Sequence, residues 1–401
     1  MAVLIGRAAL AVIGQGGGMR YGRFTVAGEP PSSARLGVLA DDDTVLDLTA
    51  LHAARPVPWP ELLVAPSLDR LLAAGRPAWL ELHRWLRETL ADPAAGLAPF
   101  QHPVDGVTPT LAFTVADYVD FFACEQHAVN AAHIFRPNDE PLTPNWRHLP
   151  IGYHGRSSTI RGSGSPVRRP NGQRGPGDFG PTGALDFEAE LGFVLGGAST
   201  PGRPVPMAEA EDHLFGVVLL NDWSARDIQV WEARPLGPLL GKAFATSVSC
   251  WVTPWPELAA AQVAPPPRDP EPLPYLRGDA DKGLDLAIEV RLNGELISSP
   301  PSAALYWTGA QFIAHLTSGG ATLSPGDLLG SGTMSGPERN QRGCLLELSW
   351  GGREPLPLAG GGELTYLRDG DELVITASAA AVGGGRLSLG EVRGRIEPAL
   401  V

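Results

Sequence analysis

The chain has 401 residues, of which 43% are hydrophobic, and a formal net charge of −13. This composition describes a globular protein long enough for two or three domains. Its acidic balance argues against an extended nucleic-acid surface, which needs clustered Lys and Arg. The 49 glycines and 39 prolines are many for a helix-rich fold, so we expect a β-dominated chain rich in turns.

Residues 1–18 begin with an apolar stretch that Arg7 interrupts. No basic region precedes this stretch and no clear small-residue cleavage site follows it, so a signal peptide is disfavoured. Gly16–Gly18 separate the stretch from Met19, which is a plausible alternative start. We therefore treat residues 1–18 as an uncertain N-terminal extension.

The cysteines indicate a reducing environment. Cys124, Cys250 and Cys344 are an odd number, are widely spaced and form no Cys-x-x-Cys pair, so neither a disulfide framework nor a zinc site is supported. No stretch approaches the length of a membrane span. We expect a cytoplasmic protein.

Short β-type runs separated by Gly, Pro and Asp turns fill residues 19–51, which favours a small β-barrel or meander. Apolar residues at helical spacing follow over 68–90, and the Pro- and His-bearing stretch 92–109 is typical of a linker. We place a domain boundary there and expect domains over 19–112 and 113–401.

Acidic side chains after two strand-like runs suggest a metal site. Glu188 and Glu190 are two residues apart in a strand-like run, so they project from the same face. Asp222 follows the apolar run 214–220, which has the pattern of a buried strand. Carboxylates held together repel one another unless a cation lies between them. Such hard oxygen ligands suit Mg²⁺ or Ca²⁺ rather than zinc.

Arg226 and Gln229 fall four and seven residues after Asp222. If this segment is helical, all three side chains lie along one stripe of the helix, so a cation and an amide donor would face the same space as the carboxylate. The alternative is that Arg226 pairs with Asp222 or Asp227 on a solvated face.

Three further residues are candidates with alternatives left open. His127 lies seven residues after Asp120 in a run of helical composition, 118–135, and a lone histidine of this kind is more often structural than functional. Glu347 lies in an apolar, strand-like run and needs a partner, for which a histidine would serve, unless it faces solvent on an edge strand. Lys242 is alone among apolar and Gly residues, and is either functional or a surface lysine with a buried stem.

The ordered motifs together are more specific than any one of them. They are Asp117–Phe121, Gln126–His127, Phe135–Arg136, Pro144–Arg156, Leu185–Glu190, Asn221–Gln229, Pro235–Pro238, Gly241–Lys242 and Ser331–Glu338. This series resembles the fumarylacetoacetase family, which acts in aromatic amino-acid breakdown. The resemblance runs from about Tyr21 to the C-terminus and is densest from Asp117 to Thr246.

The resemblance implies a chain that is mainly β with some α. It implies a small SH3-like N-terminal β-barrel domain, a larger C-terminal domain with a mixed β-sandwich roll, and a homodimer. The implied reaction is metal-dependent hydrolysis of a carbon–carbon bond in a β-diketo acid, either fumarylacetoacetate to fumarate and acetoacetate or the cleavage of a related acylpyruvate.

The resemblance also assigns roles. The implied metal ligands are Asp120, Glu188, Glu190 and Asp222, with Lys242 and Thr246 near the ion. His127 is implied to be the base that activates water, with Glu347 orienting it. Oxyanion stabilisers are implied at Arg226, Gln229 and Lys242. Substrate-contacting positions are implied at Phe122, Arg136, Tyr153, Gln229, Ala233 and Thr333.

This chain departs from the family at two of these positions, because Phe122 and Ala233 stand where the family has tyrosines. We therefore expect a roomier and less polar acyl pocket, since sites that hydrogen-bond a substrate discriminate more sharply than apolar ones. One alternative is a decarboxylase or tautomerase on the same scaffold, which needs the metal but no activated water. A non-catalytic binding protein with a relic site is the other.

Overall fold

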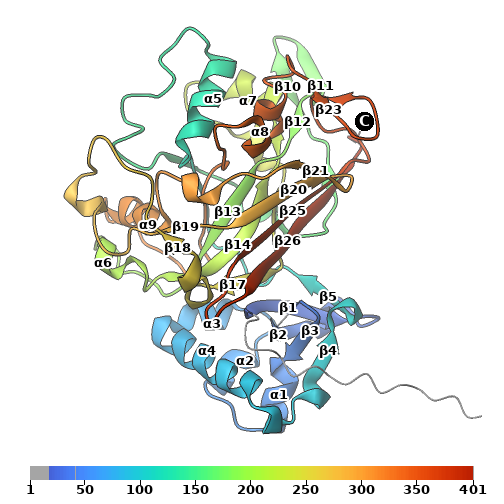
Figure 1. The fold of residues 1–401 in the computed structure, drawn as a ribbon, viewed down its shortest axis with the longest axis vertical. Helices are drawn as coiled ribbons and strands as arrows, with labels where there is room; N and C mark the ends of the chain where they lie inside the picture. The colour runs from blue at the N-terminus through green and yellow to red at the C-terminus, as the bar shows by residue number, and fades with distance from the viewer. Residues whose placement is uncertain (1–17, 41, 401) are drawn as a thin grey trace, which may run out of the picture.

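The computed structural model describes residues 18–40 and 42–400. The predicted extension at residues 1–18 therefore lies, apart from Gly18, outside the described residues. The structure confirms a chain that is mainly β with some α. A smaller N-terminal region packs against one end of a larger C-terminal region built on two sheets (Figure 1).

The N-terminal region is an antiparallel meander whose strand order is β5-β1-β2-β3-β4. The strands are β1 (Arg20–Val26), β2 (Arg35–Leu39), β3 (Thr44–Asp47), β4 (Gln101–Pro103) and β5 (Val107–Thr110). The stretch 92–109 therefore contains strands of this sheet, and its prediction as a linker was wrong. The pairings place β4 and β5 at opposite edges, and the SH3-like barrel stays a prediction.

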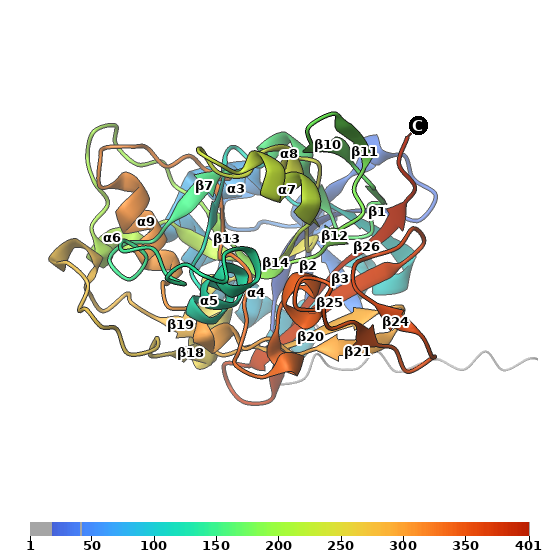
Figure 2. The same ribbon diagram turned by 90° about the horizontal axis from the view of Figure 1, so that it is seen from above.

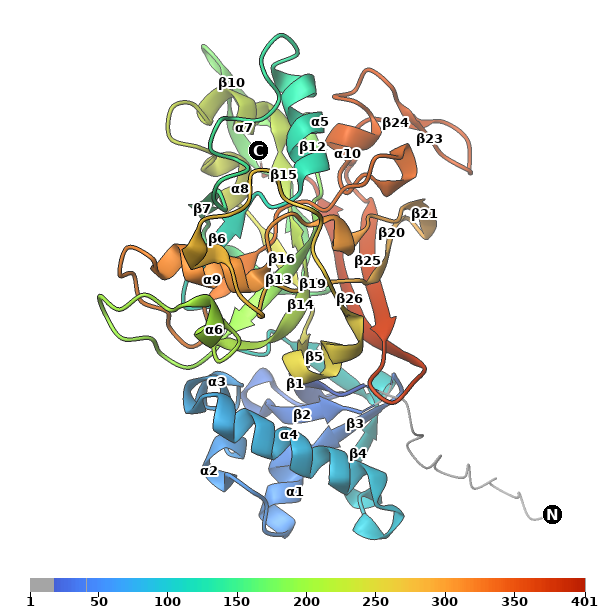
Figure 3. The ribbon, with the colours of Figure 1, turned by 60° about the vertical axis from the view of Figure 1, so that its left-hand side comes forward.

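Helices cover this small sheet (Figure 3). They are α1 (Leu48–Ala54), α2 (Pro60–Leu63), α3 (Asp69–Ala74) and α4 (Arg76–Ala91). In α4 the buried residues Trp79, Leu82, Leu86 and Leu90 recur every three or four positions, which places them on one face of the helix. That face packs into the same apolar cluster as Leu36 of β2.

The main sheet of the C-terminal region continues from β1 in the order β17-β14-β13-β22-β6-β7, with β16 joining β14 to β8. Its strands are β6 (Tyr118–Phe121), β7 (Gly152–His154), β8 (Ile160–Gly162), β13 (Ala189–Leu195), β14 (Leu214–Asp222), β16 (Thr246–Val248), β17 (Trp251–Pro254) and β22 (Leu328–Gly330). Every residue of β13 and β14 is buried, which explains their nearly continuous apolar sequence.

A second sheet has the order β21-β20-β25-β26-β9 and packs beside the first. Its strands are β9 (Val167–Arg168), β20 (Ala287–Leu292), β21 (Glu295–Ser298), β25 (Glu372–Ala380) and β26 (Arg386–Glu397). Buried residues alternate along β25, so one face points to the core. Side chains of both sheets, including Leu219 and Ile375, form one hydrophobic core.

Helices α5, α7, α8 and α10 gather at the end of the sheets that is far from the N-terminal region (Figure 3). Figure 2 looks down on this end, with α5, α7 and α8 toward the viewer. The C-terminal helices are α5 (Glu125–Phe135), α6 (Met207–Ala210), α7 (Arg226–Glu232), α8 (Leu240–Ala243), α9 (Gly309–Thr317) and α10 (Leu345–Leu348). The short strands are β10 (Asn171–Gly175), β11 (Asp178–Pro181), β12 (Leu185–Asp186), β15 (Ser224–Ala225), β18 (Gln262–Val263), β19 (Gly283–Leu284), β23 (Leu356–Pro357) and β24 (Glu363–Leu364).

The two regions are joined by hydrogen bonding as well as by packing. Tyr21 and Gly22 of β1 pair with Val252 and Trp251 of β17, so one sheet runs through both regions. The domain boundary near residue 112 remains a prediction. Among the described residues, no helix combines the length and apolar character that crossing a membrane requires.

Candidate active site

The predicted acidic residues meet at one edge of the main sheet. Asp120 is in β6, Glu188 and Glu190 lie before and within β13, and Asp222 ends β14. Because β13 lies between β14 and β22, and β22 pairs with β6, these strands present their acids to one point. One carboxylate oxygen from each residue lies within 4.8 Å of the others, and all four residues are buried.

Their close approach perturbs each carboxyl group. Burial, with the Asp222 charge second, raises the pKa of Asp120 to about 7. Burial and the neighbouring acids also raise the pKa of Glu190 well above its ordinary value, and burial raises that of Asp222. Burial acts the same way on Glu188, but Lys242 and Arg226 outweigh it and its pKa is below the ordinary value. Burial therefore disfavours the charged form of three of the four carboxyl groups.

Two oxygens of the cluster, Asp120 Oδ1 and Glu190 Oε1, are buried and have no hydrogen-bond partner among the described residues. Gly330 leaves the space beside them open, since a Cβ there would lie 2.8 Å from Asp120 Oδ1 and 3.1 Å from Glu190 Oε2. A buried carboxylate oxygen without a partner is costly. A divalent cation with oxygen ligands fits this donor set.

Cations and hydroxyl groups surround the carboxylates. Lys242 in α8 forms ion pairs with Glu188 and with Asp222, the latter at 3.1 Å between Nζ and Oδ2. Thr246 Oγ1 donates to Asp222 Oδ1 at 2.7 Å. Tyr153 donates its hydroxyl to Asp120 Oδ2 at 2.7 Å. The structure thus places Lys242 and Thr246 beside the predicted metal ligands. Lys242 is alone among apolar and Gly residues in the sequence, but in the structure it is buried and ion-paired.

Arg226 lies on the first turn of α7 and is buried. Its Nη1 donates to Glu188 Oε1 at 2.7 Å and to Gln229 Oε1 at 3.1 Å. Its Nε donates to Asp186 Oδ2 at 2.8 Å, whereas the rest of the described chain offers its Nη2 no partner. The solvated pairing with Asp222 or Asp227 was therefore the wrong alternative. Asp186 had not been predicted, although it continues the two-residue spacing of Glu188 and Glu190.

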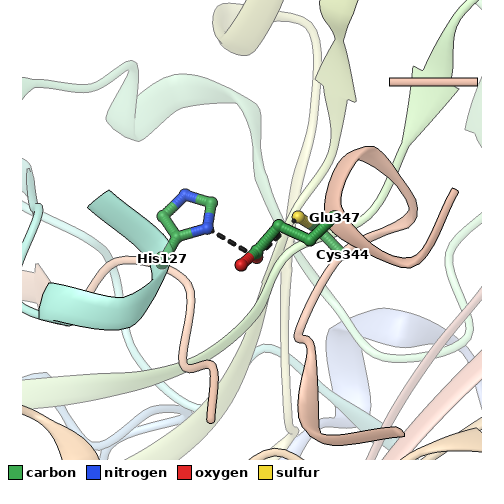
Figure 4. A group of neighbouring side chains, drawn as sticks. All are labelled: His127, Cys344 and Glu347. Carbon is green, nitrogen blue, oxygen red and sulfur yellow. Dashed lines mark hydrogen bonds and ion pairs between the residues drawn. The ribbon is translucent and has the colours of Figure 1, made fainter. Parts of the chain in front are cut away.

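His127 on α5 pairs with Glu347 on α10, with 2.7 Å between Nδ1 and Oε2 (Figure 4). The sequence reasoning expected a histidine partner for Glu347 but placed the acid in a strand, whereas it lies in a short helix. His127 was expected to continue a helix that also carried Asp120, and Asp120 is instead in a strand that ends before α5 begins. The sequence also gave no indication of the other groups that bind Glu347, which are Asn130, Ser335 and Cys344.

A pocket of about 640 Å³ opens over this arrangement. Among the predicted residues, those that line it are Asp120, Phe122, His127, Arg136, Tyr153, Glu188, Arg226, Gln229, Lys242 and Thr333. Ala233, at the C-cap of α7, is not among the lining residues. A substrate contact by Ala233 remains a prediction.

Comparison with known proteins agrees with this geometry. The family described as "Fumarylacetoacetate (FAA) hydrolase C-terminal" matches residues 118–397. The fumarylacetoacetases of Bos taurus and Homo sapiens are each 40% identical to this chain, with 95% of this chain and 95% of each relative covered. The fumarylacetoacetase of Arabidopsis thaliana is also 40% identical, with 94% of each chain covered.

Solved structures show the same fold. A fumarylacetoacetate hydrolase from Exiguobacterium antarcticum has a TM-score of 0.56 at 17% identity, covering 95% of this chain and 99% of that chain. Maleylpyruvate hydrolase from Sphingobium sp. SYK-6, in complex with manganese(II) ion and pyruvate, has a TM-score of 0.52 at 19% identity, covering 95% and 100%.

The fold, the site and these relatives define a hydrolase that acts on carbon–carbon bonds in ketonic substances. The chain belongs to the fumarylacetoacetate hydrolase family.

Proposed function

We propose that the chain hydrolyses a β-diketo acid of the acylpyruvate type, either fumarylacetoacetate to fumarate and acetoacetate or a related acylpyruvate. The names of its relatives support this substrate class. The observation that carries the proposal is that His127, which pairs with Glu347, lines one pocket together with the carboxylates Asp120 and Glu188. A base and a cation site thus face the same bound molecule.

We propose Mg²⁺ or Ca²⁺ at Asp120, Glu188, Glu190 and Asp222, because both ions prefer oxygen ligands. A divalent cation held there would supply Lewis acidity for polarising the oxygens of a bound diketo acid. The two carboxylate oxygens without partners support this assignment.

His127 acts as the general base in this proposal. Burial raises the pKa of Glu347, but His127, Asn130 and Ser335 outweigh it, so the pKa is lowered and the carboxyl is ionised at neutral pH. An ionised Glu347 can only accept, so Nδ1 of His127 is the donor and its Nε2 is free to take a proton from water. A general base of this kind contributes typically about 10² to 10⁴ in rate.

Arg226, Gln229 and Lys242 stabilise the oxyanion that forms when the water adds. Arg226 has an uncommitted Nη2, and Gln229 binds Arg226 through Oε1, which leaves its amide NH₂ as the available group. Donors already oriented in a buried site cost little reorganisation during the reaction, and losing one costs typically about 3 kcal/mol.

The remaining pocket residues bind the substrate. We propose contacts from Arg136, Tyr153 and Thr333, and a less polar acyl pocket at Phe122 and Ala233. Thr333 Oγ1 supports this role, since it is buried and has no partner within the described ranges. Phe122 lies edge-on to His127, with 5.4 Å between ring centroids, so it borders the reacting end of the pocket.

A substrate screen tests the function. Fumarylacetoacetate and a series of acylpyruvates are incubated with the enzyme, with and without a chelator, and the fragments are identified by mass spectrometry. We expect two acid fragments that carry one added water between them, formed only without chelator. Loss of CO₂ alone, or isomerisation, that persists in H127A would contradict hydrolysis and identify a decarboxylase or tautomerase.

We also propose a homodimer and a cytoplasmic location, on the basis of the family resemblance and of cysteines that form no disulfides in the described chain. Sedimentation equilibrium of the purified protein tests the homodimer by measuring its molar mass. A molar mass equal to that of a single 401-residue chain at micromolar concentration would contradict the dimer.

A further inference from the structure

Four side chains of the described residues donate hydrogen bonds to the fully buried carboxylate of Glu347. Oε2 accepts from His127 Nδ1 and Ser335 Oγ, each at 2.7 Å, and from Cys344 Sγ at 3.1 Å. Oε1 accepts from Asn130 Nδ2 at 2.7 Å. Figure 4 shows His127 and Cys344 on either side of this carboxylate. The donors come from α5, from the segment after β22 and from the N-cap of α10, and α5 lies far from the other two in sequence.

Two of these donors are themselves oriented. Gly343 N donates to Ser335 Oγ at 3.1 Å, so the hydroxyl proton of Ser335 is left to point at Glu347. Gln126 Nε2 donates to Asn130 Oδ1 at 3.0 Å, which fixes the amide with its Nδ2 toward Glu347. The Ser335 hydroxyl and the Asn130 amide are thus each oriented to donate to the Glu347 carboxylate.

The thiols of Cys344 and Cys124 form hydrogen bonds between the segments that carry Glu347, Ser335 and His127. Cys344 is the N-cap residue of α10, and its thiol makes no cap hydrogen bond but reaches Glu347 instead. Burial, followed by the charge of Glu347, raises the pKa of Cys344 well above its ordinary value, so the group is a neutral donor. Cys124, just before α5, donates to Ser335 O at 3.2 Å and accepts from Ser335 N at 3.3 Å.

We propose that Ser335, Asn130 and Cys344 are positioning residues for the water-activating pair. Together they hold the Glu347 carboxylate in the single orientation that takes the Nδ1 proton of His127. A carboxylate with fewer donors rotates or attracts water, and the imidazole then loses its fixed tautomer and direction. The inference rests on the proposed function, because it assigns these residues to that reaction.

The test compares matched variants by turnover. C344S keeps a donor at the same place, whereas C344A removes it at similar size. We expect kcat of C344A to fall about two- to tenfold, that of S335A and N130A about ten- to hundredfold, and that of C344S to stay within about twofold of wild type. KM and the affinity for Mg²⁺ measured by calorimetry stay within about twofold, because Asn130, Ser335 and Cys344 are not among the residues that line the pocket.

A second readout does not depend on turnover. The Nδ1 proton of His127 gives a downfield proton NMR resonance, assigned by its loss in H127Q, and we expect S335A to shift or broaden it while C344S preserves it. The inference is overturned if S335A and N130A retain both kcat and this resonance. If wild type cleaves no diketo acid, the proposed function fails, and the resonance still reports whether Ser335 fixes His127. Thermal melting identifies any variant that is unfolded, and C344A against C344S then provides the comparison.

Discussion

Asp186 accepts a hydrogen bond from Nε of Arg226 at 2.8 Å, and it also accepts from the backbone nitrogens of Leu345 and Leu346 at 2.7 and 2.9 Å. One buried carboxylate therefore joins the start of α7 to the start of α10. These helices carry Arg226, the proposed oxyanion donor, and Glu347, the partner of His127. Asp186 therefore fixes the position of one relative to the other.

D186A tests this relationship. It leaves the Arg226 guanidinium short of one carboxylate and leaves three buried backbone N–H groups, those of Phe187, Leu345 and Leu346, without acceptors. We expect the free energy of unfolding to fall by about 3 to 5 kcal/mol and kcat to fall more than tenfold. Urea unfolding and steady-state kinetics measure the two effects. The control is D178N, which alters an exposed aspartate. Wild-type kcat in a folded D186A protein would contradict the coupling.

E190Q tests the metal site. Glu190 Oε1 has no partner in the part of the chain that the structure describes, and burial with the neighbouring acids raises the pKa of Glu190. A neutral amide removes both the repulsion and a ligand charge, so we expect affinity for divalent cations to fall about tenfold or more while the metal-free protein is no less stable. Calorimetric titration with Mg²⁺, Ca²⁺ and Mn²⁺ and thermal melting with chelator measure these. Unchanged affinity for all three ions would exclude Glu190 as a ligand.

G330A tests the space beside the carboxylates. The added Cβ would meet Asp120 Oδ1 at 2.8 Å and Glu190 Oε2 at 3.1 Å, so the oxygens must shift. We expect weaker cation binding, by about tenfold, and a stability loss of about 1 to 3 kcal/mol. G175A is the matched control, because a Cβ at Gly175 meets nothing within 4 Å. Equal metal affinity in the two variants would contradict the expectation.

F122Y tests the acyl pocket. Phe122 lines the pocket beside His127, and a tyrosine would add a hydroxyl donor where the family has one. We expect the ratio of kcat/KM for fumarylacetoacetate to that for an acylpyruvate with an aliphatic acyl chain to rise about tenfold or more. F135Y is the control, since Phe135 also lines the pocket but is 39% exposed. The idea of an altered pocket fails if wild type already prefers fumarylacetoacetate and F122Y changes nothing.

His83 on α4 predicts a pH-dependent stability. Burial, with Arg87 second, lowers its pKa to about 4 from an ordinary 6.5, although Glu257 Oε1 lies 3.2 Å from Nε2. The unfolded chain therefore binds a proton that the folded chain does not, and this stabilisation, complete above pH 6.5, is lost as the pH falls toward 4.

Between pH 7 and pH 5, we expect the contribution of His83 to lower the free energy of unfolding by about 2 kcal/mol. The H83Q substitution should abolish this decrease. Urea unfolding at pH 7 and pH 5 compares the two proteins, and H52Q serves as a histidine control. An identical pH dependence in H83Q and wild type would show that another group is responsible.

The sequence was most informative where local pattern and local structure coincide. The two-residue spacing of Glu188 and Glu190 and the acid at the end of the apolar run 214–220 predicted three carboxylates that the structure brings together, because strand geometry fixes where such side chains point. The spacing from Arg226 to Gln229 likewise put both on one face of α7. The predicted helical stripe was wrong for Asp222, which ends strand β14 four residues before α7 begins.

Other features depend on contacts that no local pattern contains. Asp120 lies in β6 because that segment pairs with β22, about 210 residues later, so helical composition was misleading there. The four-residue helix of Glu347 is too short for periodicity to distinguish it from a strand. Its pairing with His127 joins residues 220 positions apart, and the strands within 92–109 become visible only through their partners β3 and β1.

The sheet shared by the two regions has a consequence for distant substitutions. Tyr118, two residues before Asp120, packs in the same cluster as Leu36 of the N-terminal meander and Leu220 of β14. Loosening that cluster would move the backbone that carries two of the acids, and cooperative unfolding would then spread from one region to the other. Substitutions that inactivate this enzyme therefore need not lie beside the pocket. A substitution that leaves a cavity near Leu36 would lower the amount of correctly folded protein, and so the activity, without altering the site itself.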